Sequence, residues 1–215
     1  MNKNWLNRLS WKYGRYAIRN LMLYIVIGQA VVFCFGFIMS ATGLNIYSML
    51  SFSTPDIMRG QVWRLISFIF IPPSSSILFA VLAMYFSWLM GSALENEWGS
   101  FKFNLFYLTG VILTIIGGLF TWFTTGIYLN LSLFFAFAAV YPGFQILLFF
   151  VIPIKAKYLA LLYAVFLIFS LITSGLGDRV AILASVLNLL LYFGPQLLDR
   201  TRQINRRSQW RRRFR

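Results

Sequence analysis

Histidine is absent from this chain of 215 residues, and only one cysteine is present. Imidazole is the side chain whose ordinary pKa lies nearest neutrality, so its absence excludes Ser-His and Cys-His nucleophiles and any metal site that needs a histidine ligand. Cys34 cannot form a disulfide within the chain and is interpreted as a small apolar core residue. We expect no metal and no cofactor.

Charged residues are also few, at 11%, whereas 60% of the residues are hydrophobic. A soluble core of this size could not bury so much apolar surface, so the composition predicts an integral membrane protein. The first 20 residues are basic and aromatic, and the apolar stretch after them has full membrane-span length. This pattern argues against a cleavable signal peptide.

The predicted fold is an all-α, polytopic bundle of six transmembrane helices. A long loop, residues 40–76, follows the first span and is expected to lie partly in the membrane, because its apolar stretch 65–71 is too short to cross. Pro142-Gly143 favours a break in the fourth span, with a short helix ending near Tyr141 and an interfacial stretch at 145–154. The six candidate spans are residues 21–39, 77–94, 103–123, 129–149, 158–173 and 180–198.

Positive charge is concentrated at the two ends of the chain. With six spans both termini lie on one side, and all but three of the 19 Lys and Arg residues then fall on that side. Cytoplasmic segments carry the excess of positive charge, so we expect cytoplasmic termini, in a bacterial plasma membrane. Anionic lipid is a better partner for these ends than nucleic acid, because the charges flank spans. The chain divides into a basic segment 1–20, a membrane domain 21–198 and an Arg-rich tail 199–215.

Three motifs, in this order, resemble those of the rhomboid proteins and the related derlins. The first is GQVWRL at residues 60–65, within the long loop. The second joins the second and third spans and reads GSALE at 91–95, then WGSFKF at 98–103. The third is FFVIPIKAKY at 149–158, before the fifth span. The resemblance covers roughly residues 20–195 and implies a six-helix, rhomboid-like membrane domain.

The resemblance also indicates that catalytic groups are missing. Active rhomboid proteases take a nucleophile from a Gly-x-Ser-Gly motif at the start of the fourth span and a base from a histidine in the sixth. Alignment on Pro142 places Ile127 at about the nucleophile position, and Ile182 matches the base position. Leu78 and Leu82 fall near the oxyanion-assisting residues of the second span. Hydrocarbon side chains supply no proton transfer, nucleophile or oxyanion donor, so no catalytic residue is expected.

Polar residues in the loop and the spans are candidates for binding a client protein or lipid. Trp63 and Arg64 would anchor the loop at the outer interface, with lipid phosphate or backbone carbonyls as partners of the guanidinium. Asn130, Ser132 and Asn188 lie in apolar segments, where an unpaired polar group is costly. Hydrogen bonding within or between helices is the simpler interpretation, and a client groove is the alternative.

The junction of the second and third spans predicts a structural clamp. Glu95 and Glu97 end a helix, where a carboxylate opposes the helix dipole and needs a donor. Lys102 or an N-terminal arginine is the expected partner. Gly99 and Ser100 complete the motif.

Taken with the resemblance to derlins, these features favour a non-catalytic pseudoprotease that binds transmembrane clients for quality control, retention or trafficking. An unconventional serine protease using Ser132 is one alternative. Lys155 and Lys157 are poor bases for it, because they are predicted at the opposite membrane surface. A lipid-handling or scrambling protein is the other alternative.

Overall fold

The computed structural model describes residues 11–40, 43–74, 76–148, 152–173, 175, 179–180, 182–183, 186–189 and 192. Within these residues, four segments are long and apolar enough to cross a membrane: Trp11–Ser40, Ile77–Trp98, Ser100–Thr121 and Ala156–Thr173. They correspond to the first, second, third and fifth predicted spans. The protein is therefore mainly helical and embedded in a membrane. The predicted tail lies outside the described residues, as does most of the sixth span.

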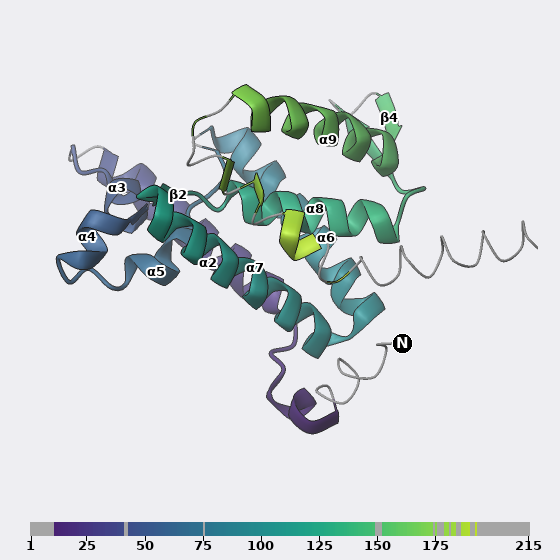
Figure 1. Cartoon of the computed structure of the whole chain (residues 1–215), viewed down its shortest axis with the longest axis horizontal. Helices are drawn as coiled ribbons and strands as arrows, with labels where there is room; N and C mark the ends of the chain where they lie inside the picture. The colour runs from purple at the N-terminus through teal and green to yellow at the C-terminus, as the bar shows by residue number, and fades with distance from the viewer. Residues whose placement is uncertain are drawn as a thin grey trace, which may run out of the picture.

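The bundle is formed by helices α2 (Leu21–Ser40), α6 (Ile77–Trp98), α7 (Ser100–Thr121), α8 (Ile127–Val140) and α9 (Ala156–Thr173), after a 3₁₀ turn η1 (Gly14–Tyr16). Helix α8 occupies the centre and packs against α6, α7 and α9 (Figure 1). Leu133 and Ala136 of α8 are fully buried there. Gly99 alone separates α6 from α7, with a φ of +83° that glycine adopts without strain.

Helix α8 has 14 residues, about 21 Å of helix, which is less than the ~30 Å of a hydrocarbon layer. It ends one residue before Tyr141, which confirms the predicted break at Pro142. The following stretch is not helical. Strands β3 (Gln145–Leu148) and β4 (Ile152–Lys155) pair antiparallel, with Gln145 opposite Lys155. The mainly helical prediction holds, with this hairpin as a local exception, because proline stops the helix and the freed backbone groups pair as strands.

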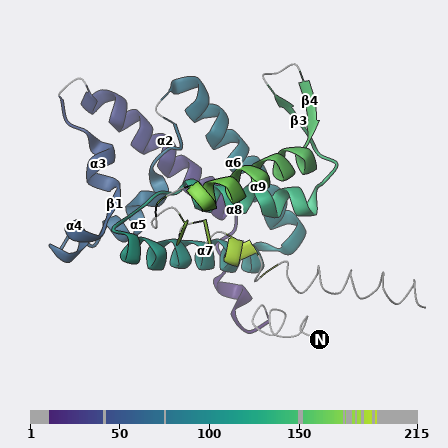
Figure 2. The same cartoon turned by 45° about the horizontal axis from the view of Figure 1, so that its top comes forward.

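The long loop is folded rather than irregular. Its described part, residues 43–74, is called L1 and contains α3 (Ile46–Leu50), β1 (Phe52–Ser53), α4 (Thr54–Met58), α5 (Arg64–Ser67) and a 3₁₀ turn η2 (Phe68–Phe70). Strand β1 pairs with β2 (Phe123–Thr124), in the connection between α7 and α8. L1 and the β3–β4 hairpin lie at opposite ends of the bundle (Figure 2).

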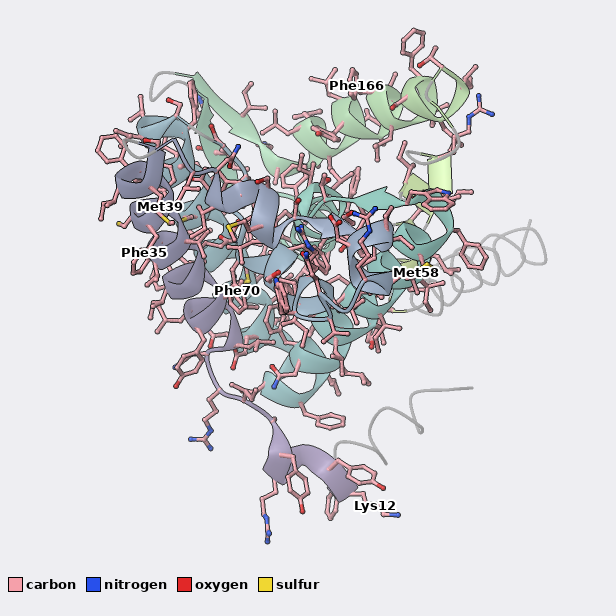
Figure 3. All side chains as sticks on the ribbon, turned by 90° about the vertical axis from the view of Figure 1, so that its left-hand side faces the viewer. Lys12, Phe35, Met39, Met58, Phe70 and Phe166 are labelled. Carbon is pink, nitrogen blue, oxygen red and sulfur yellow. The ribbon has the colours of Figure 1, made fainter. Side chains whose placement is uncertain are left out.

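The outer surface of the helices is strongly apolar. Phe35 of α2 and Phe166 of α9 are exposed on it (Figure 3). Only 11% of the most apolar stretch of α9 is buried within the protein, whereas 44% of the corresponding stretch of α7 is buried. Lipid therefore covers most of α9, and α8 provides its principal helical contact.

Two adjacent glycines of α7 allow a matched test of how L1 packs on the bundle. A Cβ at Gly118 would stand 2.5 Å from the buried ring of Phe52, whereas one at Gly117 would make an ordinary 3.4 Å contact with Val180. Gly118→Ala should lower the free energy of unfolding by about 1–3 kcal/mol through overpacking. Gly117→Ala should leave it unchanged or raise it by up to about 1 kcal/mol. Denaturant unfolding in micelles measures both, and equal effects would contradict this packing.

Candidate functional site

Arg64 organises L1 from within. Its side chain is buried, with 7% of the residue exposed. One terminal nitrogen donates to the carbonyl oxygens of Ser48 and Ser51, each at 2.7 Å, and Nε donates to Gln61 Oε1 at 2.7 Å. The other terminal nitrogen lies 3.5 Å from Asp56 Oδ2. Of the two partners considered from the sequence, Arg64 therefore engages backbone carbonyls, and its burial leaves it unavailable to a lipid phosphate.

L1 is joined to the bundle by further hydrogen bonds and by ring packing. Thr54 donates its hydroxyl to the carbonyl of Gly118 at 3.0 Å and its N–H to the carbonyl of Trp122 at 3.0 Å. Gln29 of α2 donates to the carbonyl of Ile69 at 3.0 Å. The ring of Phe52 packs on α7 at Gly118, and within L1 it meets the ring of Phe68 edge to face. These contacts hold L1 over the N-terminal end of α8.

A cavity of about 220 Å³ lies between L1 and the start of α8. Ile127 lines it, with half of its surface exposed, and so does Asn130 one turn along the helix. The rest of the wall comes from L1 and from the segment before α8: Tyr47, Ser51, Phe68, Ile71, Pro72, Pro73, Thr124, Thr125 and Gly126. The cavity combines apolar walls with amide and hydroxyl groups.

The positions that the resemblance assigns to catalysis do not share the described wall of the cavity. Ile127 lines it, whereas Ile182 is buried against Leu131 and Leu167 and is not part of the described wall. Leu78 is exposed on α6 and is also outside the wall. Among the described residues that line the cavity, none can act as a base near neutral pH.

Ser132 and Asn188 serve the packing of the helices. Ser132 is buried and donates to the carbonyl of Leu129 at 2.8 Å, away from the cavity wall. Asn188 is buried, accepts a hydrogen bond from the Thr109 hydroxyl at 3.0 Å and donates to the carbonyl of Phe106 at 3.4 Å. The interhelical hydrogen bonding expected of Asn188 is thus observed.

The junction between α6 and α7 lies at the other end of the bundle. Glu95 Oε1 accepts hydrogen bonds from the Ser100 hydroxyl at 2.6 Å and from the N–H of Asn20 at 2.8 Å. The prediction of Lys102 or an arginine as the partner of Glu95 is wrong within the described residues. The Ser100 hydroxyl and the backbone N–H of Asn20 are the donors to this buried carboxylate instead. Glu95 therefore ties the start of α2 to the α6–α7 turn.

The side chains of Trp63 and Tyr141 lie nearer the protein surface. Trp63 is exposed on L1, as expected for an interfacial anchor. Tyr141 donates to Glu97 Oε2 at 3.4 Å, and burial together with this carboxylate raises the pKa of its hydroxyl.

Sequence reasoning overlooked the residues that precede α8. Thr124-Thr125-Gly126 is the small polar segment that commonly starts a helix, and this signal could have placed hydroxyl groups at the head of the fourth span. No local sequence pattern marks Tyr47 as a cavity residue, because only the folding of L1 brings α3 to the cavity. Within the described residues, no three His, Cys, Asp or Glu side chains gather as a metal site would require.

No protein-family model matches this chain, and no curated protein sequence matches it significantly.

Replacement of Arg64 tests whether it stabilises L1. Arg64→Met keeps the length of the side chain but leaves the carbonyls of Ser48 and Ser51 without their donor. The free energy of unfolding should fall by about 3 kcal/mol or more, and amide exchange across α3 and α4 should accelerate. Arg59→Met is the matched control, because Arg59 is exposed and pairs only with Asp56 at the surface; it should cost under about 1 kcal/mol.

Replacement of Glu95 tests the clamp at the junction. Glu95→Ala removes the acceptor of the Asn20 N–H, so exchange of that amide should accelerate by about tenfold or more. Glu97→Ala should leave it unchanged, because Glu97 contacts Tyr141 instead. Hydrogen exchange followed by mass spectrometry gives both rates, and an unchanged rate in Glu95→Ala would refute the clamp.

Proposed function

We propose that the protein is a non-catalytic, rhomboid-like membrane protein that binds transmembrane segments of client proteins for their quality control, retention or trafficking. The observation that carries the proposal is the cavity between L1 and α8, whose described wall holds no nucleophile paired with a base. The place where the resemblance puts a nucleophile holds Ile127. An open, chemically inert cavity in a membrane protein is suited to binding.

The sparse packing of α9 against α8 supports a route by which a client helix could enter the protein from the lipid. Helix α9 contacts α8 through a small apolar cluster that includes Leu131 and Leu167. In lipid, helices gain no hydrophobic free energy by associating with one another, so contacts this sparse can be exchanged for contacts with another helix at small cost. The short α8 would then face the client with Asn130 near its end, which lowers the cost of a marginally apolar segment.

The distribution of charge supports cytoplasmic termini. Described basic residues gather at the end that contains the α6–α7 junction: Lys12, Arg15, Arg19, Lys102, Lys155 and Lys157. At the other end, Arg64 and Arg59 pair with Asp56. By the positive-inside rule, this distribution supports L1 on the outside, with anionic lipids as partners of the basic end.

Site-specific photo-crosslinking in native membranes tests client binding. A benzophenone amino acid at Ile127 should form adducts with transmembrane segments of other proteins, identified by mass spectrometry. The matched control is the same probe at Ile112, which is similarly exposed on the lipid-facing surface of α7. Protein adducts enriched at position 127 support the proposal. Adducts with lipid alone, or identical adducts at both positions, would overturn it.

A further inference from the structure

Residues 11–19, called segment S1, precede the first membrane-spanning helix α2 and are fixed to the bundle. The carbonyl of Ile18 accepts a hydrogen bond from the side chain of Asn104 on α7 at 3.0 Å. Asn20 follows with a φ of +55°, a left-handed conformation that asparagine adopts more readily than most residues, and turns the chain into α2. Its N–H donates to Glu95 Oε1 at 2.8 Å. Segment S1 is therefore a surface element with a defined position.

The exposed side chains of S1 alternate between aromatic and basic residues. Trp11 is 93% exposed and Tyr16 is 74% exposed. Lys12 extends away from the helices (Figure 3), and its Nζ lies 5.4 Å from the centre of the Tyr13 ring. The Arg15 guanidinium lies 5.8 Å from the centre of the Tyr16 ring. Amphipathic rings favour the membrane–water interface, and long basic side chains beside them carry their charge to the level of lipid headgroups.

The charge around S1 is positive. The first 55 residues of the chain contain no Asp or Glu, and Lys102 adds a further cation near the start of α7. Among the carboxylates at this end of the bundle, Glu95 is buried and Glu97 contacts Tyr141. Segment S1 is therefore complementary to an anionic surface. For a segment next to a membrane span, anionic phospholipid headgroups provide such a surface.

We propose that S1 binds anionic phospholipid headgroups and that this binding is coupled to the Glu95 clamp. The amide that Glu95 accepts from is the one that joins Arg19 to Asn20, so the clamp fixes the last residue of S1. A segment that already has a defined position loses less conformational entropy when it binds lipid. By thermodynamic reciprocity, bound lipid then stabilises the hydrogen bond between Asn20 and Glu95. The inference rests on the proposed placement of this end at the cytoplasmic leaflet.

Hydrogen exchange of the full chain in lipid nanodiscs measures the coupling. The two membranes are phosphatidylcholine alone and phosphatidylcholine mixed with phosphatidylglycerol, which differ in the net charge of their headgroups. Phosphatidylglycerol should slow exchange of the Asn20 amide by about fivefold or more, as a coupling of ordinary size does. An unchanged rate would overturn the coupling.

Two double variants that remove equal charge separate S1 from the rest of the basic end. Lys12→Gln combined with Arg15→Gln should weaken phosphatidylglycerol binding to the delipidated protein by about tenfold or more, measured by native mass spectrometry. Lys155→Gln combined with Lys157→Gln removes two other exposed charges at the same end and should weaken it much less. Equal losses in the two double variants would overturn S1 as the binding surface.

Two replacements of Glu95 test whether its hydrogen bond, rather than its charge, provides the coupling. Glu95→Gln and Glu95→Ala both remove the negative charge, but only glutamine keeps an oxygen that can accept the N–H of Asn20. Glu95→Gln should bind phosphatidylglycerol about fivefold more tightly than Glu95→Ala. Equal affinities would overturn the coupling. Crosslinking at Ile127 reports on the opposite end of the bundle, so failure of the lipid measurements would leave the test of client binding intact.

Discussion

Buried backbone carbonyls must find donors within the protein, and L1 meets this requirement through Arg64. One guanidinium serves two carbonyls, a glutamine and an aspartate, and so converts a loop with three short helices into a fixed lid over α8. The β1–β2 pair satisfies the backbone where L1 meets the α7–α8 connection. Everything proposed for the cavity depends on this arrangement, because L1 forms one of its walls.

The short central helix follows from the same constraint. Helix α8 cannot span the membrane alone, and its ends would be costly if they faced lipid. The surrounding helices cover its sides, the β3–β4 hairpin takes over at one end, and L1 covers the other. The result is an uncapped helix start inside the protein, next to a buried threonine hydroxyl.

The cavity between L1 and α8 has an apolar side chain, Ile127, beside the polar residues Thr124 and Asn130 in its described wall. Ile182 is buried in a separate apolar cluster with Leu131 and Leu167. Ser132 is occupied by its own helix backbone. Hydrogen-bond donors such as the Asn130 amide can bind a ligand and orient it without reacting with it.

Much of the architecture was determined by the sequence itself, because long apolar runs, Pro142 and the distribution of Lys and Arg act locally or through the membrane. Four spans and the break after Tyr141 were predictable on that basis. The hydrogen-bond partners of the polar groups were not predictable in this way. Only the tertiary structure decided that Glu95 binds Ser100 and the backbone of Asn20 rather than Lys102, that β3 and β4 form a hairpin, and that Tyr47 and Thr124 share a cavity. Glu95 and Asn20, and Tyr47 and Thr124, are far apart in the chain, and even for the nearer partners hydrophobic periodicity carries no information about which donor reaches which acceptor.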